Sequence, residues 1–350
     1  MRQTSHKKKN HSVDAQYPEL RFHPTLREWV VISPRRSLRH QASGSPIKKS
    51  PKVFAPKSKC PFEFPQRAGN KDPYFWFPAH KPVAAWTLQV FENKYPALDA
   101  FRPLRIHQAP PFVVVSGSGV HDLVVTRDHD KNFSQLSARR AADVLRAYGM
   151  RYRQIAQRPD IAYISMFQNW GLSAGGTVHH PHYQMIGLPI VPTDVERSID
   201  ISRRWYRAHH TCIHCQYVND ARRQKHRVVY EDREYIAFAP FASMRPFAVD
   251  FFPKKHSAFF EDMTDQECVR AAIALQKVLG KIRRALHDPD YNFFIHTAPV
   301  VGRSSASHYH WHIEIVPHAH IDAGFELGTG IEINPVAPED AARLLRGEGA

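Results

Sequence analysis

Two long stretches of the chain carry apolar residues at the spacing of an amphipathic helix. Residues 264–286 open with Thr264 and Glu267, which stand at the spacing of a capping box. Behind them the apolar residues recur every three or four positions, at Val269, Ala272, Ile273, Leu275, Leu279 and Ile282. The stretch after Ser137 repeats this pattern at Ala141, Val144, Leu145 and Tyr148. This periodicity predicts two capped helices that each bury one face.

Shorter apolar runs flank both helices, and the order of the elements occurs twice. In the first copy "DLVVT" and a histidine precede the helix, and "DIAYISMF" and "HHPHYQMIGLPIVP" follow it. In the second copy "FAVDFFP" and a histidine precede the helix, and "YNFFIHT" and "HYHWHIEIVP" follow it. The matching histidines are 127, 128 and 128 residues apart: His129 and His256, His180 and His308, and His182 and His310. Matched spacings in the same order predict a duplicated unit.

Each copy combines several strands with one helix, so the predicted fold class is α+β. We expect a mostly antiparallel sheet with helices packed on it. The first half is predicted at residues 18–195 and the second at 196–350, with the stretch 193–211 as the link. Residues 1–17 are basic at their start and contain no apolar run, which predicts a disordered tail.

The composition indicates where in the cell the protein works and which partners it binds. The chain has 350 residues, 43% of them hydrophobic, and no run of 18 apolar residues that could cross a membrane. No apolar stretch follows its basic start, which argues against a secretory signal, and we expect a cytoplasmic protein. The net charge of +15 favours an anionic partner, either nucleic acid or a phosphorylated small molecule. Because the basic residues are scattered and form no nucleic-acid-binding signature, we expect no nucleic-acid partner.

Four cysteines and 23 histidines supply candidate metal ligands. The Cys-x-x-Cys pair in a chain with so few cysteines indicates a metal site rather than a disulfide framework. With two histidines it makes a tetrahedral zinc set, Cys212, Cys215, His256 and His310. The first copy offers a glutamate in place of the second cysteine, in the set Cys60, Glu63, His129 and His180. That site either binds zinc through a carboxylate oxygen or has lost its metal.

The two histidine clusters lie on predicted strands, where residues two apart project from one face. Two rows are therefore predicted, one of His180, His182 and Gln184, and one of His308, His310 and His312. A row of imidazoles can bind a metal, or one ring can attack phosphorus while its neighbours hold the oxygens. Because His310 belongs to the predicted zinc set, it is a poor candidate for the nucleophile.

Eight sequence blocks follow one another along roughly residues 18–347: "ELRFHPTLREWVVISPRRSLRH", "CPFE", "FENKYPAL", "GVHDLVVTRDH", "FQNWGLSAGGTVHHPHYQ", "YIAFAPFASMRPF", "HWHIEIVP" and "AGFELGTGIEINPVAPEDAARLLR". By these blocks and their order the chain resembles the galactose-1-phosphate uridylyltransferase family, the transferase branch of the histidine-triad superfamily, which has CPFC where this chain has "CPFE". The resemblance implies two histidine-triad-like halves with bound zinc. It also implies a homodimer with active sites at the subunit interface.

The resemblance further implies a double-displacement reaction. His182 matches the second histidine of the family's H-P-H-x-Q motif, the nucleophile that attacks the α-phosphorus of a nucleoside diphosphate sugar. The nucleoside monophosphate stays on that histidine until a second hexose 1-phosphate takes it up. Gln184 matches the glutamine that hydrogen-bonds the non-bridging phosphoryl oxygens. Histidine-triad hydrolases usually carry His at that position, so the glutamine favours a transferase.

Other positions match family residues that contact the substrate. The implied contacts are Arg36, Arg39, Asn169, Gly175, Gly176 and Thr177 with the phosphates, Asn93 with the nucleoside, and Phe325 and Glu326 with the hexose. Tyr183 replaces the small residue that usually separates the nucleophile from the glutamine, and we expect its ring to crowd the nucleotide.

Three functional hypotheses follow. The leading one is transfer of UMP between hexose 1-phosphates. Its alternative is an adenylyltransferase similar to ADP-glucose phosphorylase. The second is a histidine-triad hydrolase or phosphorylase that uses the cluster at 308–312. The third, a non-catalytic nucleic-acid-binding protein, rests on the charge of +15 alone.

Overall fold

The computed structural model describes residues 17–36, 52, 55–319 and 321–348. Residues 1–16 of the predicted tail, and Arg39, lie outside the described residues. Across the described ranges, no helix is both long enough and apolar enough to cross a membrane.

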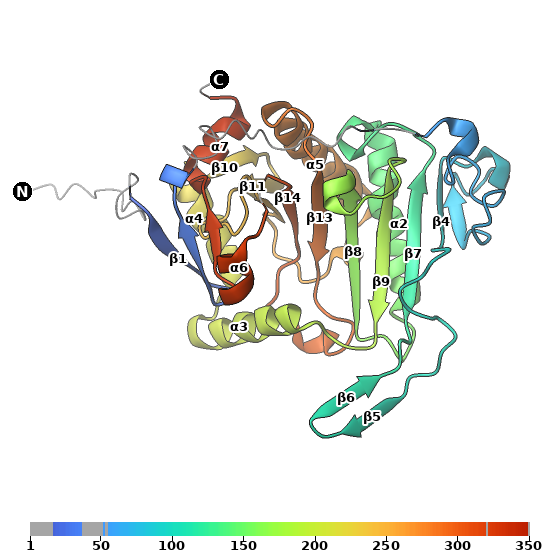
Figure 1. The fold of residues 1–350 in the computed structure, drawn as a ribbon, viewed down its shortest axis with the longest axis horizontal. Helices are drawn as coiled ribbons and strands as arrows, with labels where there is room; N and C mark the ends of the chain where they lie inside the picture. The colour runs from blue at the N-terminus through green and yellow to red at the C-terminus, as the bar shows by residue number, and fades with distance from the viewer. Residues whose placement is uncertain (1–16, 37–51, 53–54, 320, 349–350) are drawn as a thin grey trace, which may run out of the picture.

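One antiparallel sheet organises the described residues. Its ten strands follow one another in the order β10, β11, β12, β14, β13, β8, β9, β7, β4 and β3. Their bounds are β3 Phe75–Phe77, β4 Leu88–Glu92, β7 Val120–Thr126, β8 Tyr163–Trp170, β9 His182–Leu188, β10 Val228–Glu231, β11 Tyr235–Phe238, β12 Val249–Pro253, β13 Tyr291–His296 and β14 His312–Pro317. At the centre, β8 of the first half pairs with β13 of the second, so both halves share one sheet (Figure 1). The predicted α+β class with a mostly antiparallel sheet is confirmed.

Two long helices cover one face of the sheet, where they lie side by side (Figure 1). They are α2 (Ala138–Ile155) and α5 (Asp265–Ala285). Both predicted caps are present. The Ser137 hydroxyl accepts the N–H of Arg140 at 3.3 Å, and Thr264 and Glu267 form the reciprocal capping box. The helical spacing of the sequence therefore located both helices and their starts.

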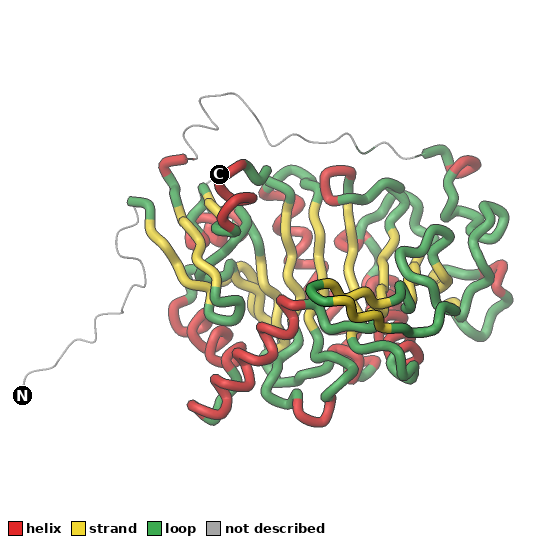
Figure 2. The backbone as a smooth tube through the Cα atoms, turned by 60° about the horizontal axis from the view of Figure 1, so that its bottom comes forward, coloured by secondary structure: helices red, strands yellow, loops and turns green. Residues whose placement is uncertain are grey.

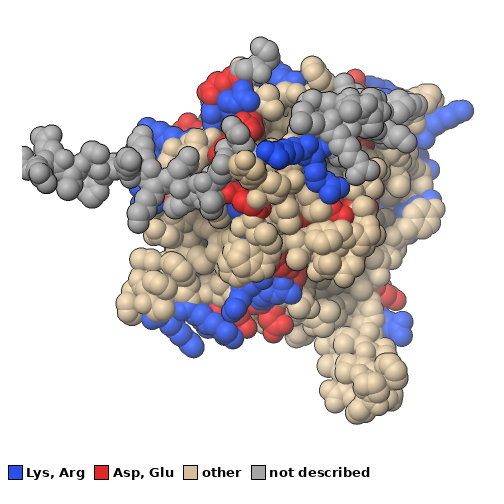
Figure 3. Space-filling view, turned by 60° about the vertical axis from the view of Figure 1, so that its left-hand side comes forward, with Lys and Arg blue, Asp and Glu red and all other residues tan. Residues whose placement is uncertain are grey.

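Smaller elements surround the sheet (Figures 1 and 2). They are the sheet of β1 (Glu19–His23), β2 (Glu28–Ile32) and β15 (Glu332–Asn334), the hairpin of β5 (Ile106–Ala109) and β6 (Phe112–Val115), and the helices α3 (Thr193–His209), α4 (Ile213–Gln224), α6 (Gly324–Thr329) and α7 (Pro338–Arg346). Helix α3 occupies most of the predicted link at 193–211. On the face in Figure 3, Lys and Arg are interspersed with Asp and Glu and with uncharged surface.

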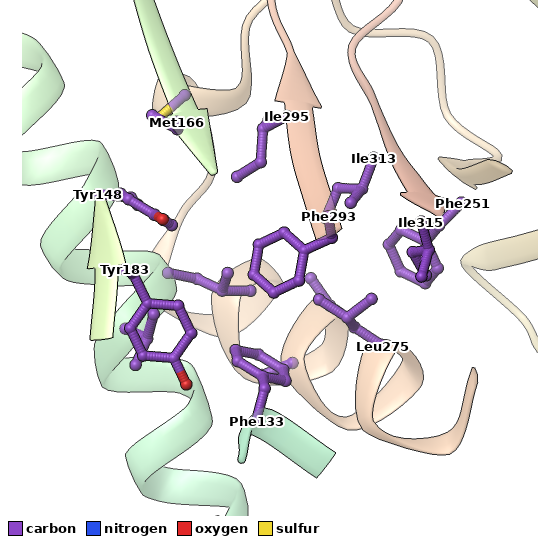
Figure 4. Packing of buried hydrophobic residues seen from close by; sticks show 14 of the residues in the cluster. Phe133, Tyr148, Met166, Tyr183, Phe251, Leu275, Phe293, Ile295, Ile313 and Ile315 are labelled. Atoms are coloured by element: carbon purple, nitrogen blue, oxygen red, sulfur yellow. The ribbon is translucent and has the colours of Figure 1, made fainter. Parts of the chain in front are cut away.

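Tyr183 lies in the core between the sheet and the two long helices (Figure 4). Its fully buried ring lies 6.0 Å from Phe133, 6.3 Å from Tyr148 and 6.3 Å from Phe293 between centroids. Neighbouring residues of a strand point to opposite faces, so this side chain points away from His182. The expectation that Tyr183 crowds the nucleotide is wrong, because the pleat of β9 turns it into the core.

Both strands that carry the histidine clusters begin later in the sequence than predicted. Strand β9 begins at His182 and β14 at His312, so His180, His308 and His310 stand before the strands rather than in a row on them. Phe167 lies opposite Gln184 and Phe294 opposite Glu314 in the two copies. The connection from β13 to β14 is therefore three residues longer than the connection from β8 to β9, and this insertion changes the spacing of the repeat. The structural counterparts are His180 with His310 and His182 with His312, 130 residues apart rather than 128.

Replacing Tyr183 by Ala is expected to lower the free energy of unfolding by about 3–5 kcal/mol, because it leaves a cavity in the packed core. Urea denaturation followed by circular dichroism measures this loss. The matched control is Tyr95→Ala, since Tyr95 is 79% exposed, and its effect should stay within about 0.5 kcal/mol. Equal effects at the two sites would contradict the placement of Tyr183.

Candidate active site and metal centres

His182 opens β9 on the face of the sheet opposite the two long helices. Its Nδ1 donates to the carbonyl oxygen of His180 at 2.9 Å. A carbonyl only accepts, so the proton of a neutral ring sits on Nδ1 and Nε2 keeps its lone pair. The Phe62 ring packs 5.0 Å from the imidazole, and burial lowers the pKa of His182. The ring is thus held in one orientation, with the lone pair of Nε2 free of the His180 carbonyl.

Gln184 lies two residues further along β9, on the same face as His182. Its Oε1 is 2.9 Å from Nε2 of His121, which stands on the neighbouring strand β7. Asn93, just after β4, places its Nδ2 3.1 Å from the same ring nitrogen. The structure therefore brings Asn93 and Gln184 together through a histidine that the sequence reasoning missed. In "GVHDLVVT" this histidine stands between Val120 and Asp122, which gives no sign of its partners, and strand register decided which side chains it meets.

Asn169, near the end of β8, lies against the loop 171–177, which we call the glycine turn. The Asn169 Oδ1 accepts a hydrogen bond from Asn292 Nδ2 at 2.8 Å. Gly175 takes a positive φ of 82°, and a Cβ at Gly176 would lie 2.9 Å from the Asn169 carbonyl oxygen. Glycine is therefore required for this close packing. Thr177, at the end of the turn, is exposed.

The second half of the chain holds the glycine turn through Asp290, which precedes β13. The Asp290 carboxylate accepts the Ser173 N–H at 2.9 Å and the Ser173 hydroxyl at 2.7 Å. Gly171 has a φ of +89°, and a Cβ there would collide with this carboxylate. Neither Asp290 nor Asn292 was among the candidate site residues of the sequence, because their roles arise only from the pairing of β8 with β13.

The first candidate metal centre lies beside His182. The ligand atoms of Cys60, His129 and His180 lie within 4.8 Å of one another. Cys60 Sγ and His129 Nδ1 are each 3.3 Å from His180 Nδ1. The Glu63 Oε2 is 3.5 Å from His129 Nδ1, and this buried oxygen accepts no hydrogen bond from the described residues. Glu63 stands outside the set whose ligand atoms all lie within 4.8 Å, but its buried oxygen without a donor, beside the His129 ring, fits a fourth position at a cation.

The second candidate centre contains all four predicted ligands. The ligand atoms of Cys212, Cys215, His256 and His310 lie within 4.8 Å of one another. Cys215 Sγ is 3.2 Å from His256 Nδ1 and 3.4 Å from His310 Nδ1. Tetrahedral zinc with these ligands places them about 3.4–3.8 Å apart. The Cys215 thiol, and then the two rings, lower the pKa of Cys212.

Backbone carbonyls fix the tautomers of three of the four cluster histidines. Nε2 of His180 donates to the Thr126 carbonyl at 2.7 Å, that of His129 to Ala55 at 2.8 Å, and that of His256 to Ser307 at 2.8 Å. Each Nδ1 is therefore left unprotonated and faces the other ligands. Metal-binding histidines are oriented in this way, so both residue sets fit zinc.

The counterpart of the His182 site in the second half has different chemistry. His312 matches His182, but Glu314 stands in the place of Gln184, and Asp250 lies opposite Glu314 across β12 and β14. They line a cavity of about 90 Å³ that α3, α4 and the end of β1 close. Nucleotide-sized ligands need several hundred Å³, and the acidic side chains of Glu314 and Asp250 stand where the first half has Gln184 and Leu123. This half therefore does not favour a phosphoryl reaction.

Three residues expected at the substrate lie far from His182 within one chain. Arg36 follows β2, while Phe325 and Glu326 belong to α6, which precedes β15 of the same small sheet (Figure 1). This small sheet packs on Ala242, just after β11. In the order of the large sheet, β11 is five strand spacings from β9, about 24 Å. The chain alone does not bring these residues to His182.

Comparisons with known proteins agree in covering nearly the whole chain. A family model described as galactose-1-phosphate uridyl transferase, N-terminal domain, matches residues 8–217, and the model of its C-terminal domain matches residues 198–345. ADP-glucose phosphorylase of Arabidopsis thaliana is 38% identical over 342 residues, which cover 96% of this chain and 94% of that protein. Galactose-1-phosphate uridylyltransferase of Thermotoga maritima is 28% identical over 343 residues, with 94% and 98% covered.

Solved structures give the same picture. The crystal structure of ADP-glucose phosphorylase from Arabidopsis thaliana with bound ADP-glucose aligns with a TM-score of 0.79 at 34% identity, covering 95% of this chain and 100% of that chain. A structure described as uridylyltransferase aligns with a TM-score of 0.70 at 26% identity, covering 94% and 97%.

Replacing Cys215 by Ser is expected to remove about one zinc ion per chain, because a structural zinc site needs all four ligands. Mass spectrometry of metals in the purified protein measures the content. Cys60→Ser tests the first centre in the same way. Cys268→Ser is the control, since this buried thiol lies outside both clusters. An unchanged zinc content in both cluster variants would contradict the assignment.

Proposed function

This chain belongs to the galactose-1-phosphate uridyl transferase family, and we propose that it transfers an adenylyl group from ADP-glucose through a covalent intermediate on His182. The observation that carries the proposal is the 2.9 Å hydrogen bond from His182 Nδ1 to the His180 carbonyl, which leaves Nε2 ready to attack phosphorus. Gln184 and the glycine turn lie on the same side of the sheet and supply donors for phosphoryl oxygens.

The reaction has two steps. In the first, Nε2 of His182 attacks the α-phosphorus, a P–N bond forms, and glucose 1-phosphate leaves with the bridging oxygen. In the second, an oxygen of inorganic phosphate attacks the same phosphorus, the P–N bond breaks, and ADP is released. A hexose 1-phosphate as acceptor would instead give a new nucleotide sugar. Zinc bound in the first centre would hold His180 and with it the carbonyl that orients His182.

The choice of base rests on similarity. Sequence reasoning placed UMP first, whereas the similarities favour the adenylyl alternative. Identity to the Arabidopsis ADP-glucose phosphorylase is 38%, against 28% to the Thermotoga uridylyltransferase, over nearly the same length. The related crystal structure that contains ADP-glucose also aligns with a higher TM-score, 0.79 against 0.70.

With radiolabelled ADP-glucose and no acceptor, the protein is expected to form a stoichiometric adduct that is acid-labile and base-stable. His182→Ala should form none, and its turnover should fall by about 10³-fold or more, because the nucleophile is lost. His107→Ala, on the exposed strand β5, is the matched control and should react normally. Parallel reactions with UDP-glucose, and with phosphate or galactose 1-phosphate as acceptor, assign base and acceptor. An adduct in His182→Ala would contradict the mechanism.

We also propose that a second copy of the chain completes the site. Arg36 and Phe325 lie at the far end of the sheet from His182, and both are exposed. A two-fold dimer would bring this end of one chain to His182 of its partner, and the same contact would then occur twice. In this arrangement Arg36 of one chain would reach the substrate bound at His182 of the other chain.

The dimer proposal predicts complementation between two inactive variants. His182→Ala and Arg36→Ala are each expected to be strongly impaired alone. Unfolded together and refolded, they should recover about a quarter of the wild-type activity, because about half of the dimers then carry one intact site out of two. The control mixes His182→Ala with Gln184→Ala, whose lesions fall in the same site, and should recover nothing. Equal activity of both mixtures would contradict a shared site.

A further inference from the structure

His121 is a buried histidine on the same face of the sheet as His182, and no role has been assigned to it above. It stands on β7 and is 8% exposed. Its carbonyl accepts the Asn93 N–H at 2.8 Å, which ties β7 to the end of β4. Its side chain lies between Asn93 and Gln184, at 3.1 and 2.9 Å from its Nε2. Two residues implied to hold the nucleotide therefore meet the same ring nitrogen.

The hydrogen bonds around His121 determine where its proton sits. Nδ1 accepts the backbone N–H of Ala97 at 3.0 Å, so this nitrogen carries no proton. A neutral imidazole must then be protonated at Nε2. The Asn93 Oδ1 is already engaged with the Tyr95 N–H at 3.0 Å. The acceptor that meets Nε2–H is therefore Gln184 Oε1.

The His121 Nε2–H determines which end of the Gln184 amide faces His121. An amide can be turned by half a rotation, which exchanges its oxygen and its NH₂ group. A turned Gln184 would leave the His121 N–H with no acceptor, because the other group beside it, at 3.1 Å, is the NH₂ of Asn93. It would also present the Gln184 oxygen to the phosphoryl group. With Oε1 held by His121, the NH₂ group is left to donate to a non-bridging phosphoryl oxygen.

We propose that His121 is a positioning residue that orients the Gln184 amide for nucleotidyl transfer. The inference rests on the proposed function, in which Gln184 donates to the transferring phosphoryl group. His121 does not touch that group and acts only through the glutamine. Its loss should therefore slow the transfer step and leave the affinity for the nucleotide sugar nearly unchanged, since most binding contacts are elsewhere.

The test compares His121→Phe, Gln184→Ala and the double variant. Rapid-quench mixing with labelled ADP-glucose gives the rate of adduct formation on His182 in a single turnover. His121→Phe is expected to slow it about 10- to 100-fold, as for other supporting hydrogen bonds. In the double variant the His121 change should add nothing to the Gln184→Ala loss. His121→Gln, which keeps a donor, should recover part of the rate, and His107→Phe on β5 is the control.

Two outcomes would overturn the inference. One is a multiplicative loss in the double variant, because His121 would then act independently of Gln184. The other comes from nuclear magnetic resonance of protein labelled with ¹⁵N-histidine, which reads the tautomer without turnover. A proton on Nδ1 of His121 contradicts the inference whatever the activity. If the wild-type protein forms no adduct but His121 is protonated at Nε2, the proposed function fails and the catalytic role of His121 fails with it.

Discussion

The antiparallel pairing of β8 with β13 is the contact on which the rest of the site depends. It joins the two copies of the repeat into one sheet, with Asn292 opposite Asn169. The same pairing brings Asp290 under the glycine turn, where it accepts two hydrogen bonds from Ser173. The first half carries His182, the proposed nucleophile, but the second half holds the glycine turn beside it. A separated first half would lose both supports.

The two copies share a scaffold and differ in chemistry at a few positions. In each, a histidine just before a strand belongs to a cluster of candidate metal ligands, and the next histidine donates its Nδ1–H to the carbonyl oxygen of that histidine. The first copy has Gln184 and an apolar Leu123 where the second has Glu314 and Asp250. The first copy therefore keeps a side chain that can donate to an anion, Gln184. In the second copy the acidic side chains of Glu314 and Asp250 take that place, and helices α3 and α4 cover the cavity. One of the two geometrically similar histidines is therefore suited to phosphorus chemistry.

Local patterns explain which parts of the structure could be predicted. The capping residues and the helical spacing located α2 and α5 because these signals act within a few residues. Cys-x-x-Cys with two repeated histidines located the second cluster for a similar reason, since ligand type limits what can gather. The repeat itself was recognised, but its register at the histidines was wrong by two residues. Three extra residues in the loop before β14 shift the start of that strand. The spacing of the histidines does not show whether such an insertion lies before or after them.

The sequence by itself determined the duplicated α+β fold, the cluster ligands, and the H-P-H-x-Q segment with its family resemblance. These depend on residue type and on contacts close along the chain. Only the tertiary structure decided that Tyr183 faces the core, that His121 meets Gln184, and that Asp290 supports the glycine turn. Only the tertiary structure placed Arg36 and α6 at the end of the sheet away from His182. Each of these depends on strand order and register, which long-range pairing sets and no short stretch of sequence encodes.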